Sequence, residues 1–134
     1  MKKIQILFVI TALTAALAVF LGAFGAHGLK PLLSEYQLMI YEKAVFYQFV
    51  HVLASFVALL ASLFFRNEKF QTTSILFLTG VLLFSGSLYG LAIYDLFPLP
   101  KFILGPITPL GGMLFTIGWI WLAYCFSQVS FSDK

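Results

Sequence analysis

Four long stretches without a charged residue constrain this chain more than any other feature of its sequence. The eight basic and five acidic residues all lie within residues 2–3, 30–43, 66–69, 95–101 and 133–134. Crossing a hydrocarbon layer of about 30 Å takes about 20 apolar helical residues. Between the charged segments, residues 4–26, 44–65, 70–94 and 107–127 are each long enough. They predict four spans in a single transmembrane domain, residues 1–134.

Composition excludes a soluble globular domain. The chain is 61% hydrophobic and 10% charged, with a mean hydropathy of +1.00, whereas ordinary domains carry about 25% charged residues. The apolar stretches are continuous and lack the alternation of membrane strands. The fold class we expect is therefore an all-α, integral membrane four-helix bundle with antiparallel spans. An N-terminal signal peptide is the alternative for the first span, but its uncharged run exceeds the typical apolar core of such peptides.

The sparse charges also limit the chemistry. No basic patch with interleaved aromatic residues is present, and the single cysteine, Cys125, has no Cys/His spacing typical of a metal site around it. Glu35, Glu42 and Asp95 fall at the expected membrane surface. We therefore predict no nucleic-acid partner, no metal, no cofactor and no catalytic residue, and we favour a protein that is not an enzyme.

Basic residues predict the orientation of the spans. Five of them (Lys2, Lys3, Arg66, Lys69 and Lys134) share one side of the membrane, and three (Lys30, Lys43 and Lys101) share the other. Because basic residues are retained in the cytoplasm, both termini are predicted to be cytoplasmic.

The connections between spans differ in character. Ser34 and Gln37 form the sequence pattern of a capping box, which predicts a helix from Glu35 that either extends span two into the headgroup region or bends as an interfacial helix. Residues 97–112, FPLPKFILGPITPLGG, hold four of the five prolines. Because proline removes a backbone donor, we expect an irregular segment there, with Thr108 capping span four.

Small residues recur at helical spacing within the spans, as they do where membrane helices pack closely. We expect helix packing at Ala18, Gly22, Ala26, Gly86, Gly90, Gly111 and Gly118.

Polar side chains gather in the half of the membrane opposite the termini. Tyr47, Gln48 and His51 are three or four residues apart and share one helix face. An ionisable residue inside a membrane is a functional-site hypothesis by default, yet a neutral, hydrogen-bonded histidine also locks helices together. The predicted cluster or binding site comprises His27, Tyr47, Gln48, His51, Ser85, Ser87, Tyr89 and Thr108.

Five motifs give the chain a resemblance to a known family. They are GAFGAHGL at 22–29, YEKAVFYQFVH at 41–51, FSGSLY at 84–89, ITPLGG at 107–112 and GW at 118–119. Together they resemble the YgdD-like family, small membrane proteins of uncharacterised function in bacterial inner membranes. The resemblance implies four spans and an inner-membrane location, with no assigned reaction, substrate or cofactor. The family's Tyr-Gln-x-x-His pattern maps onto Tyr47, Gln48 and His51, and Val50 stands where relatives often have an aromatic residue.

Three functional hypotheses follow. The first is a non-enzymatic structural or interaction protein with a buried polar cluster around His51. The second is a small transporter or pore, built as a homo-oligomer, with His27 and His51 lining the path. The third is a lipid-binding membrane protein or enzyme. The lipid bilayer is the expected environment in all three, with a homo-oligomer or a bound lipid as further partners.

Overall fold

The computed structural model describes residues 2–97 and 101–130. The described residues form helices joined by short connections and contain no strand: α1 (Lys3–Phe24) continues as a π-helical turn, η1 (Gly25–Leu29), and α2 (Glu35–Phe64), α3 (Lys69–Ile93) and α4 (Lys101–Ser127) follow. Four helices are long and apolar enough to cross a membrane. The expected all-α, four-helix membrane fold is thereby confirmed.

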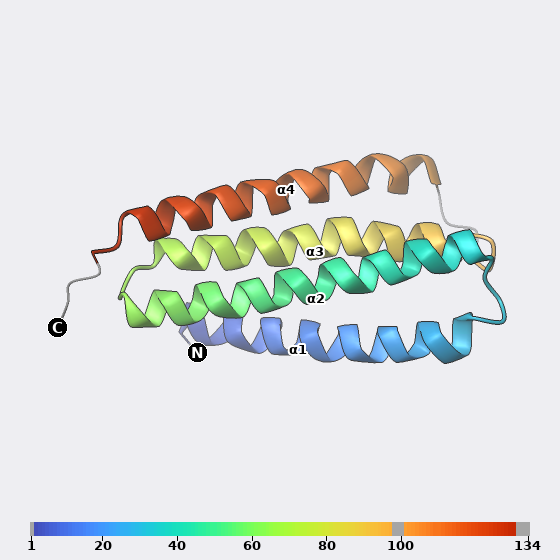
Figure 1. Ribbon diagram of the computed structural model, residues 1–134, viewed down its shortest axis with the longest axis horizontal. Helices are drawn as coiled ribbons and strands as arrows, with labels where there is room; N and C mark the ends of the chain where they lie inside the picture. Colours follow the sequence, from blue (N-terminus) through green and yellow to red (C-terminus); the bar gives the residue numbers. More distant parts are fainter. Residues whose placement is uncertain (1, 98–100, 131–134) are drawn as a thin grey trace.

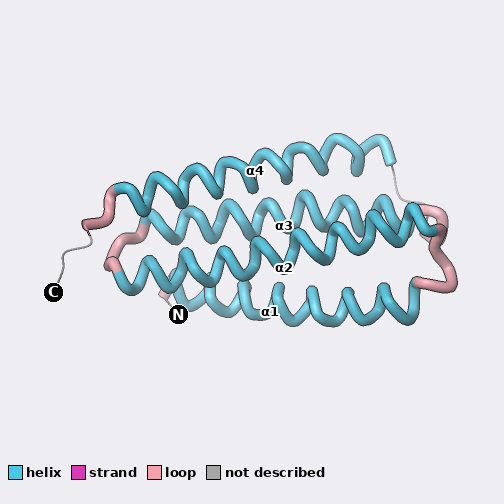
Figure 2. The backbone as a smooth tube through the Cα atoms, in the orientation of Figure 1, coloured by secondary structure: helices cyan, strands magenta, loops and turns pink. Residues whose placement is uncertain are grey.

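The helices lie antiparallel and side by side in chain order (Figure 1). α2 and α3 pack along each other at the centre, α4 packs on α3, and α1 packs mainly on α2. The connections lie at the two ends of the bundle (Figure 2). The terminal end holds both termini and the α2–α3 turn, and the loop end holds the α1–α2 and α3–α4 connections.

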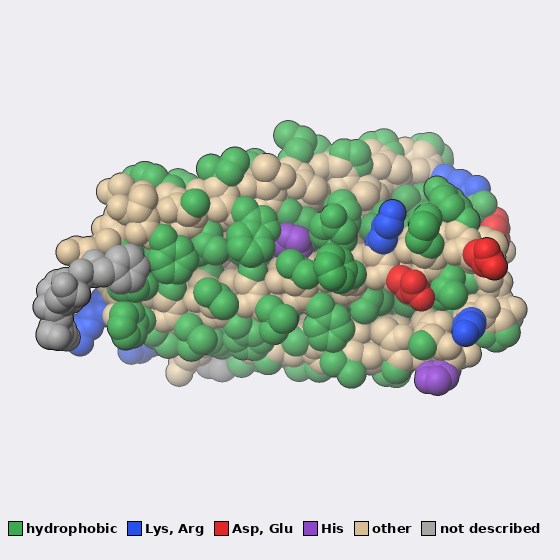
Figure 3. Space-filling view, viewed as in Figure 1, with side chains coloured by type: hydrophobic (Ala, Val, Ile, Leu, Met, Phe, Trp, Pro, Cys, Tyr) green, Lys and Arg blue, Asp and Glu red, His purple; other side chains and the backbone are tan. Residues whose placement is uncertain are grey.

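The outer helices are much less buried than the central ones. In the most apolar window of each helix, half of the residues are buried in α2 and 39% in α3, against 17% in α1 and in α4. Apolar side chains cover the middle of the face shown in Figure 3, and charged side chains lie toward its ends. α1 and α4 thus present most of their surface to the bilayer.

Local sequence signals set the boundaries of α2. Ser34 accepts a hydrogen bond from the Gln37 backbone, and the Gln37 side chain accepts one from the Ser34 backbone, so the predicted capping box is confirmed. At the other end Arg66 adopts a left-handed conformation (φ 51°) and the Asn67 amide bonds to the Ser62 carbonyl, a Schellman turn. α2 runs unbroken for 30 residues, about 45 Å. The segment that begins at Glu35 is therefore an extension of span two and not a separate interfacial helix.

The proline-rich connection differs from its expected form. α4 begins at Lys101 and includes Pro106 and Pro109, so residues 101–108 are helical where an irregular segment was expected; residues 98–100 lie outside the described part. Proline in a membrane helix is tolerated where nearby groups satisfy the freed backbone. Pro106 and Pro109 are the sixth and ninth residues of α4, beyond its first four N–H groups, so the carbonyls of Phe102 and Gly105 each lose an intrahelical donor.

Candidate functional site

A row of polar residues on α2 connects the helices on its inner side. Tyr41, Gln48, Ser55 and Ser62 are seven residues apart and buried, so they lie along one face of the helix. We call these four residues the polar seam. Each makes a hydrogen bond to α1 or α3.

The half of the seam nearer the loop end ties α1 to α2 and α3. Gln48 Nε2 donates to the Thr14 carbonyl at 2.9 Å, and the Tyr89 hydroxyl donates to Gln48 Oε1 at 2.7 Å. The Tyr41 hydroxyl donates to the Leu21 carbonyl at 2.9 Å, just before the π-helical turn. The rings of Tyr41 and Tyr89 meet edge to face, with centroids 4.9 Å apart. Gln48 is thus the bridge among three helices.

The half nearer the terminal end is a chain of hydroxyl groups. Ser55 Oγ lies 3.2 Å from Thr11 Oγ1 on α1 and 2.6 Å from Ser74 Oγ on α3. Two turns further along α2, Ser62 Oγ accepts a hydrogen bond from Gln71 Nε2 of α3 at 3.3 Å. Buried hydroxyls need such partners, because an unpaired one costs about 1–3 kcal/mol.

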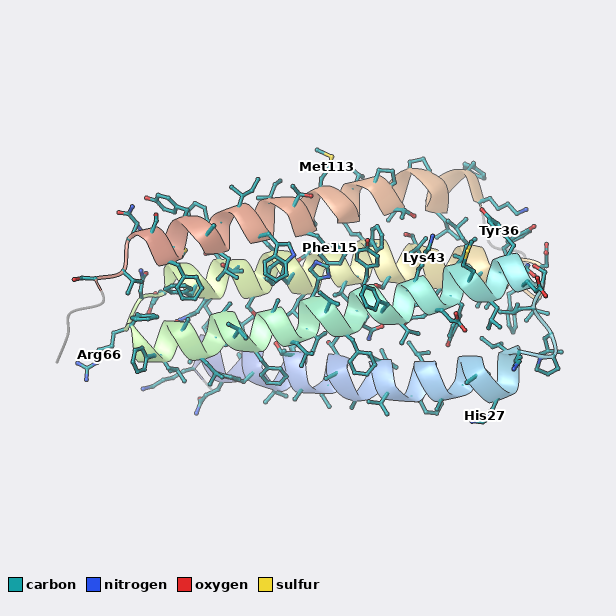
Figure 4. The ribbon with its side chains drawn as sticks, viewed as in Figure 1. His27, Tyr36, Lys43, Arg66, Met113 and Phe115 are labelled. Carbon is teal, nitrogen blue, oxygen red and sulfur yellow. The ribbon has the colours of Figure 1, made fainter. Side chains whose placement is uncertain are left out.

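His51 lies on the neighbouring face of α2 and points toward α4. Its Nδ1 atom is 2.8 Å from the Tyr47 carbonyl oxygen, which can only accept, so Nδ1 carries the proton. Nε2 accepts from the Trp119 indole N–H at 3.1 Å. The ring stacks on Phe115 with centroids 3.4 Å apart, and Figure 4 shows Phe115 between α4 and the central helices. Both ring nitrogens of the neutral histidine are therefore used.

The other predicted polar residues lie apart from His51. Ser87 Oγ is 2.7 Å from Thr108 Oγ1, joining α3 to α4. His27 is exposed on η1 and lies on the outer side of that helix, away from the bundle (Figure 4). The predicted cluster is thus divided. Gln48 and Tyr89 join α1 to α3, and Tyr47, His51 and Ser87 face α4, which carries Thr108. His27 stands alone at the loop end.

Glycines bring α3 and α4 into very close contact. A Cβ atom on Gly80 or Gly118 would lie 2.6 Å from the ring of Phe115 or Phe77, and one on Gly111 would collide with the backbone of Phe84. The remaining small residues expected at helix contacts differ in how far they are buried. Ala18 and Gly90 are buried, Gly22 is half-buried against Val45, and Ala26 and Gly86 are exposed.

A cavity of about 480 Å³ lies between α1 and α3. Its walls are mostly aliphatic and extend from Leu7 to Leu21 on α1 and from Ile75 to Tyr89 on α3, and α2 contributes Gln48. None of the described residues that line it is charged. A second cavity, of about 370 Å³, lies between α1 and α2 near the loop end, and its lining includes Glu42.

Two neighbouring residues distinguish the larger cavity. The Ser85 hydroxyl is fully buried and has no hydrogen-bond partner within the described residues. A Cβ added to Gly86 would meet no atom within 4 Å. Both line the cavity, so this wall of α3 combines free space with a polar group that lacks a partner.

Sequence reasoning did not identify several residues of these groups. Trp119 was not connected with His51, and Tyr41, Thr11 and Ser74 were not assigned polar roles. The seven-residue spacing from Tyr41 to Ser62 was a signal that could have revealed the whole seam. Trp119 had no such signal, since its pairing with His51 depends on how α4 is rotated.

The geometry supports binding more than reaction chemistry. Among residues 2–97 and 101–130, no group of three His, Cys, Asp or Glu side chains could hold a metal ion. The buried hydroxyls near the cavity have no imidazole or carboxylate beside them in the lining. What the site offers is an apolar space whose lining includes Tyr89 and three residues with hydroxyl groups, Thr14, Thr79 and Ser85.

Comparisons with known proteins place the chain in a family. Residues 21–112 match the model described as "Protein of unknown function (DUF423)". A UPF0382 membrane protein of Staphylococcus aureus is 41% identical over 88% of this chain and 92% of its own. YwdK of Bacillus subtilis, also a UPF0382 membrane protein, is 41% identical over 87% of this chain and 91% of its own. A Haemophilus influenzae UPF0382 membrane protein is 44% identical, over 86% and 88%. No solved structure matches.

Proposed function

Since the chain belongs to the DUF423 family, a bacterial membrane-protein family of unknown function, we propose its function from its own geometry: it is a non-enzymatic protein that binds a membrane lipid between α1 and α3. The cavity of about 480 Å³ carries this proposal. Ligand pockets typically measure about 300–1,000 Å³ and are mainly apolar, and this one is in that range.

The shape of the cavity favours a hydrocarbon chain. Its walls extend from Leu7 to Leu21 on α1 and from Ile75 to Tyr89 on α3, which corresponds to about 21 Å along each helix at 1.5 Å per residue. Leu17 and Leu82 at its edge are 50% and 72% exposed, so the cavity opens sideways toward the hydrocarbon layer. Lipid tails are the molecules that fill that layer and run parallel to the helices.

The remaining polar groups have a structural role in this proposal. His51 and Tyr47, together with Ser87 and Thr108, hold α4 against the central helices, while Gln48 and Tyr89 keep α1 at the distance that leaves the cavity open. The protein resides in the inner membrane with both termini in the cytoplasm, so the loop end faces outward. A homo-oligomer is not required, because the cavity lies within one chain.

The test is to fill the cavity and measure bound lipid. In Gly86→Leu the new side chain enters space that no described atom occupies, so folding is preserved while the lipid is excluded. The full-length protein is purified in mild detergent, and lipids that remain bound are counted by native mass spectrometry. We expect stoichiometric lipid on the wild type and at most about a tenth of that on the variant, since the leucine side chain and a lipid chain cannot occupy the same space.

Gly105→Leu is the matched control. Gly105 is also a helical, exposed glycine with nothing within 4 Å of an added Cβ, but it lies on α4 away from the cavity. The control should retain the wild-type amount of lipid. Equal lipid on all three proteins would overturn the proposal.

A further inference from the structure

We infer that the second cavity, between α1 and α2 near the loop end, binds an organic cation with an apolar body, such as a quaternary ammonium compound, and that Glu42 is its counter-ion. The cavity measures about 370 Å³, and Glu42 is the one charged residue among the described residues that line it. It shares no lining residue with the α1–α3 cavity. This inference therefore does not depend on the proposed lipid binding.

Small residues of α1 and η1 form one wall of this cavity, namely Gly22, Gly25 and Ala26. A Cβ atom on Gly25 would lie 2.5 Å from the Tyr41 ring, and one on Gly22 would lie 3.4 Å from the Val45 side chain, so the backbone comes close to α2. Gly25 is also the first residue of the π-helical turn, a rare conformation that often occurs at functional sites. The backbone of this segment thus provides the space for a ligand.

The opposite wall is formed by side chains of α2. Phe46 and Phe49 are four and seven residues from Glu42, so all three lie on one face of the helix. Seven residues correspond to about 10 Å along the helix, and Glu42 is nearer the loop end. The wall therefore has a carboxylate near the membrane surface and aromatic rings deeper in the hydrocarbon layer. A ligand with a charged group above an apolar body matches this order.

Glu42 has no counter-ion within the protein. Its carboxylate makes no hydrogen bond or ion pair with any residue in 2–97 or 101–130. The adjacent Lys43 lies on the side of α2 nearer α4, and His27 lies on the outer side of η1 (Figure 4). None of the described lining residues is basic, so a phosphate or carboxylate of a ligand would meet only a like charge. The charge of the cavity favours a cation.

The rest of the lining indicates an organic cation and not a metal ion. Calcium takes six to eight oxygen ligands, and no group of three His, Cys, Asp or Glu residues that could hold a metal ion occurs in the described part of the chain. Aromatic rings attract ammonium groups through their faces, and Phe46 is 63% exposed. A carboxylate beside accessible rings therefore suits an alkylammonium group.

The experiment compares two radiolabelled probes of the same shape. One is decyltrimethylammonium, and the other is its neutral counterpart, in which a carbon atom replaces the nitrogen. Each is equilibrated with the full-length protein in a non-ionic detergent, which brings no competing charge, and uptake by protein-free micelles is subtracted. We expect the cation to bind the wild type about tenfold more tightly than the neutral probe, because it alone gains the contact with Glu42.

Glu42→Gln and Glu35→Gln form a matched pair of variants. Both residues are exposed on α2, so neither substitution should affect folding, but Glu35 does not line the cavity. Glu42→Gln should reduce the affinity for the cation to that for the neutral probe and leave the neutral probe unaffected. Glu35→Gln should bind both probes as the wild type does.

A third variant tests the location of the site. Ala26 is exposed and lines the cavity, so the side chain of Ala26→Leu enters the space of the ligand. It should weaken the binding of both probes about tenfold or more. Gly86→Leu, which fills the α1–α3 cavity, should bind both probes normally.

The outcomes separate this inference from the proposed function. If the wild type binds both probes equally, or if Glu42→Gln retains the preference for the cation, Glu42 is not the counter-ion and the inference fails. If Ala26→Leu binds both probes as the wild type does, the cavity is not the site and the inference fails as well. Lipid binding between α1 and α3 stands in each of these cases, and its own failure with Gly86→Leu would leave the cation site intact.

Discussion

Gly80 and Gly86 are six residues apart on α3, yet their surroundings are opposite. An added Cβ at Gly80 would lie 2.6 Å from the Phe115 ring of α4, whereas one at Gly86 would meet nothing within 4 Å. One glycine allows a close helix contact, and the other widens a cavity. A small residue in a membrane helix therefore indicates that the surface is hollow there, and the neighbouring helix determines whether the hollow is filled.

The partners of α3 explain the difference. α4 brings large aromatic side chains and its own glycines to the contact, so rings from each helix lie over glycines of the other. α1 approaches α3 mainly through the polar seam of α2. Hydrogen bonds fix the positions of helices without filling the space between them, and packing within the membrane depends on filled space. The α3–α4 contact is thus dense and the α1–α3 face is open.

The largest expected effect comes from breaking the dense contact. Gly111→Ala places a methyl group against the Phe84 backbone, which cannot move aside as a flexible side chain could. Overpacking of this kind costs about 1–3 kcal/mol, and we expect the upper part of that range in the free energy of unfolding, measured by denaturant titration in detergent.

Gly112→Ala is the control for this substitution. It is the next residue of α4, and its added Cβ would lie at an ordinary 3.7 Å from the Phe84 ring. Alanine also favours helix over glycine by about 1 kcal/mol, so this variant should be as stable as the wild type or slightly more so. Equal destabilisation by both substitutions would mean that α3 and α4 do not meet as closely as described.

A somewhat smaller effect is expected at His51, which joins the central helices to α4. His51→Ala leaves the Trp119 N–H without its acceptor and a space beside Phe115. Loss of a buried partner costs about 1–3 kcal/mol, and we expect about 2 kcal/mol. His27→Ala, at the exposed histidine, should leave the free energy of unfolding unchanged.

The protonation of His51 gives a second readout. At neutral pH, ¹⁵N NMR of the ring should show the neutral form with the proton on Nδ1, because Nδ1 faces a carbonyl and Nε2 faces an N–H. A ring with protons on both nitrogens would contradict this geometry. It would instead favour the alternative of a transport path through His51.

The sequence predicted the helices better than the contacts between them. Uncharged length and the Ser34 capping box defined spans and a boundary because these signals are local. The rotation of each helix is not local: Gln48 and His51 are three residues apart and share a broad face, yet one bonds to Tyr89 on α3 and the other to Trp119 on α4. The hydropathy of spans that are apolar on all sides gives little indication of which side meets a neighbour.

The prolines of α4 also show that local sequence signals do not determine the fold by themselves. Pro106 and Pro109 are strong local signals against helix, and they led to the expectation of an irregular segment. They nevertheless lie inside α4, where the contact with α3 continues through the pair of Thr108 and Ser87. Packing against α3 therefore accompanies a helical conformation that the local sequence disfavours.

The smallest effect on the free energy of unfolding should come from weakening the hydrogen bonds beside the α1–α3 cavity. Tyr89→Phe removes the hydroxyl that donates to Gln48 and retains the ring that packs on Tyr41. Side-chain hydrogen bonds between membrane helices are worth about 0.6 kcal/mol on average, so overall stability should barely change.

Local opening of α1 should nevertheless respond to this substitution, because Tyr89 holds the Gln48 side chain that donates to the Thr14 carbonyl of α1, and α1 itself has few contacts with α3. Hydrogen exchange reports such local opening, and amides near Thr14 should exchange faster in Tyr89→Phe while those of α4 stay unchanged. Tyr124→Phe, at an exposed ring of α4, is the control and should alter neither helix. If Tyr89→Phe instead accelerated exchange in α1 and α4 alike, the two faces of α3 would be one cooperative unit, and the contrast between a dense and an open face would not extend to their dynamics.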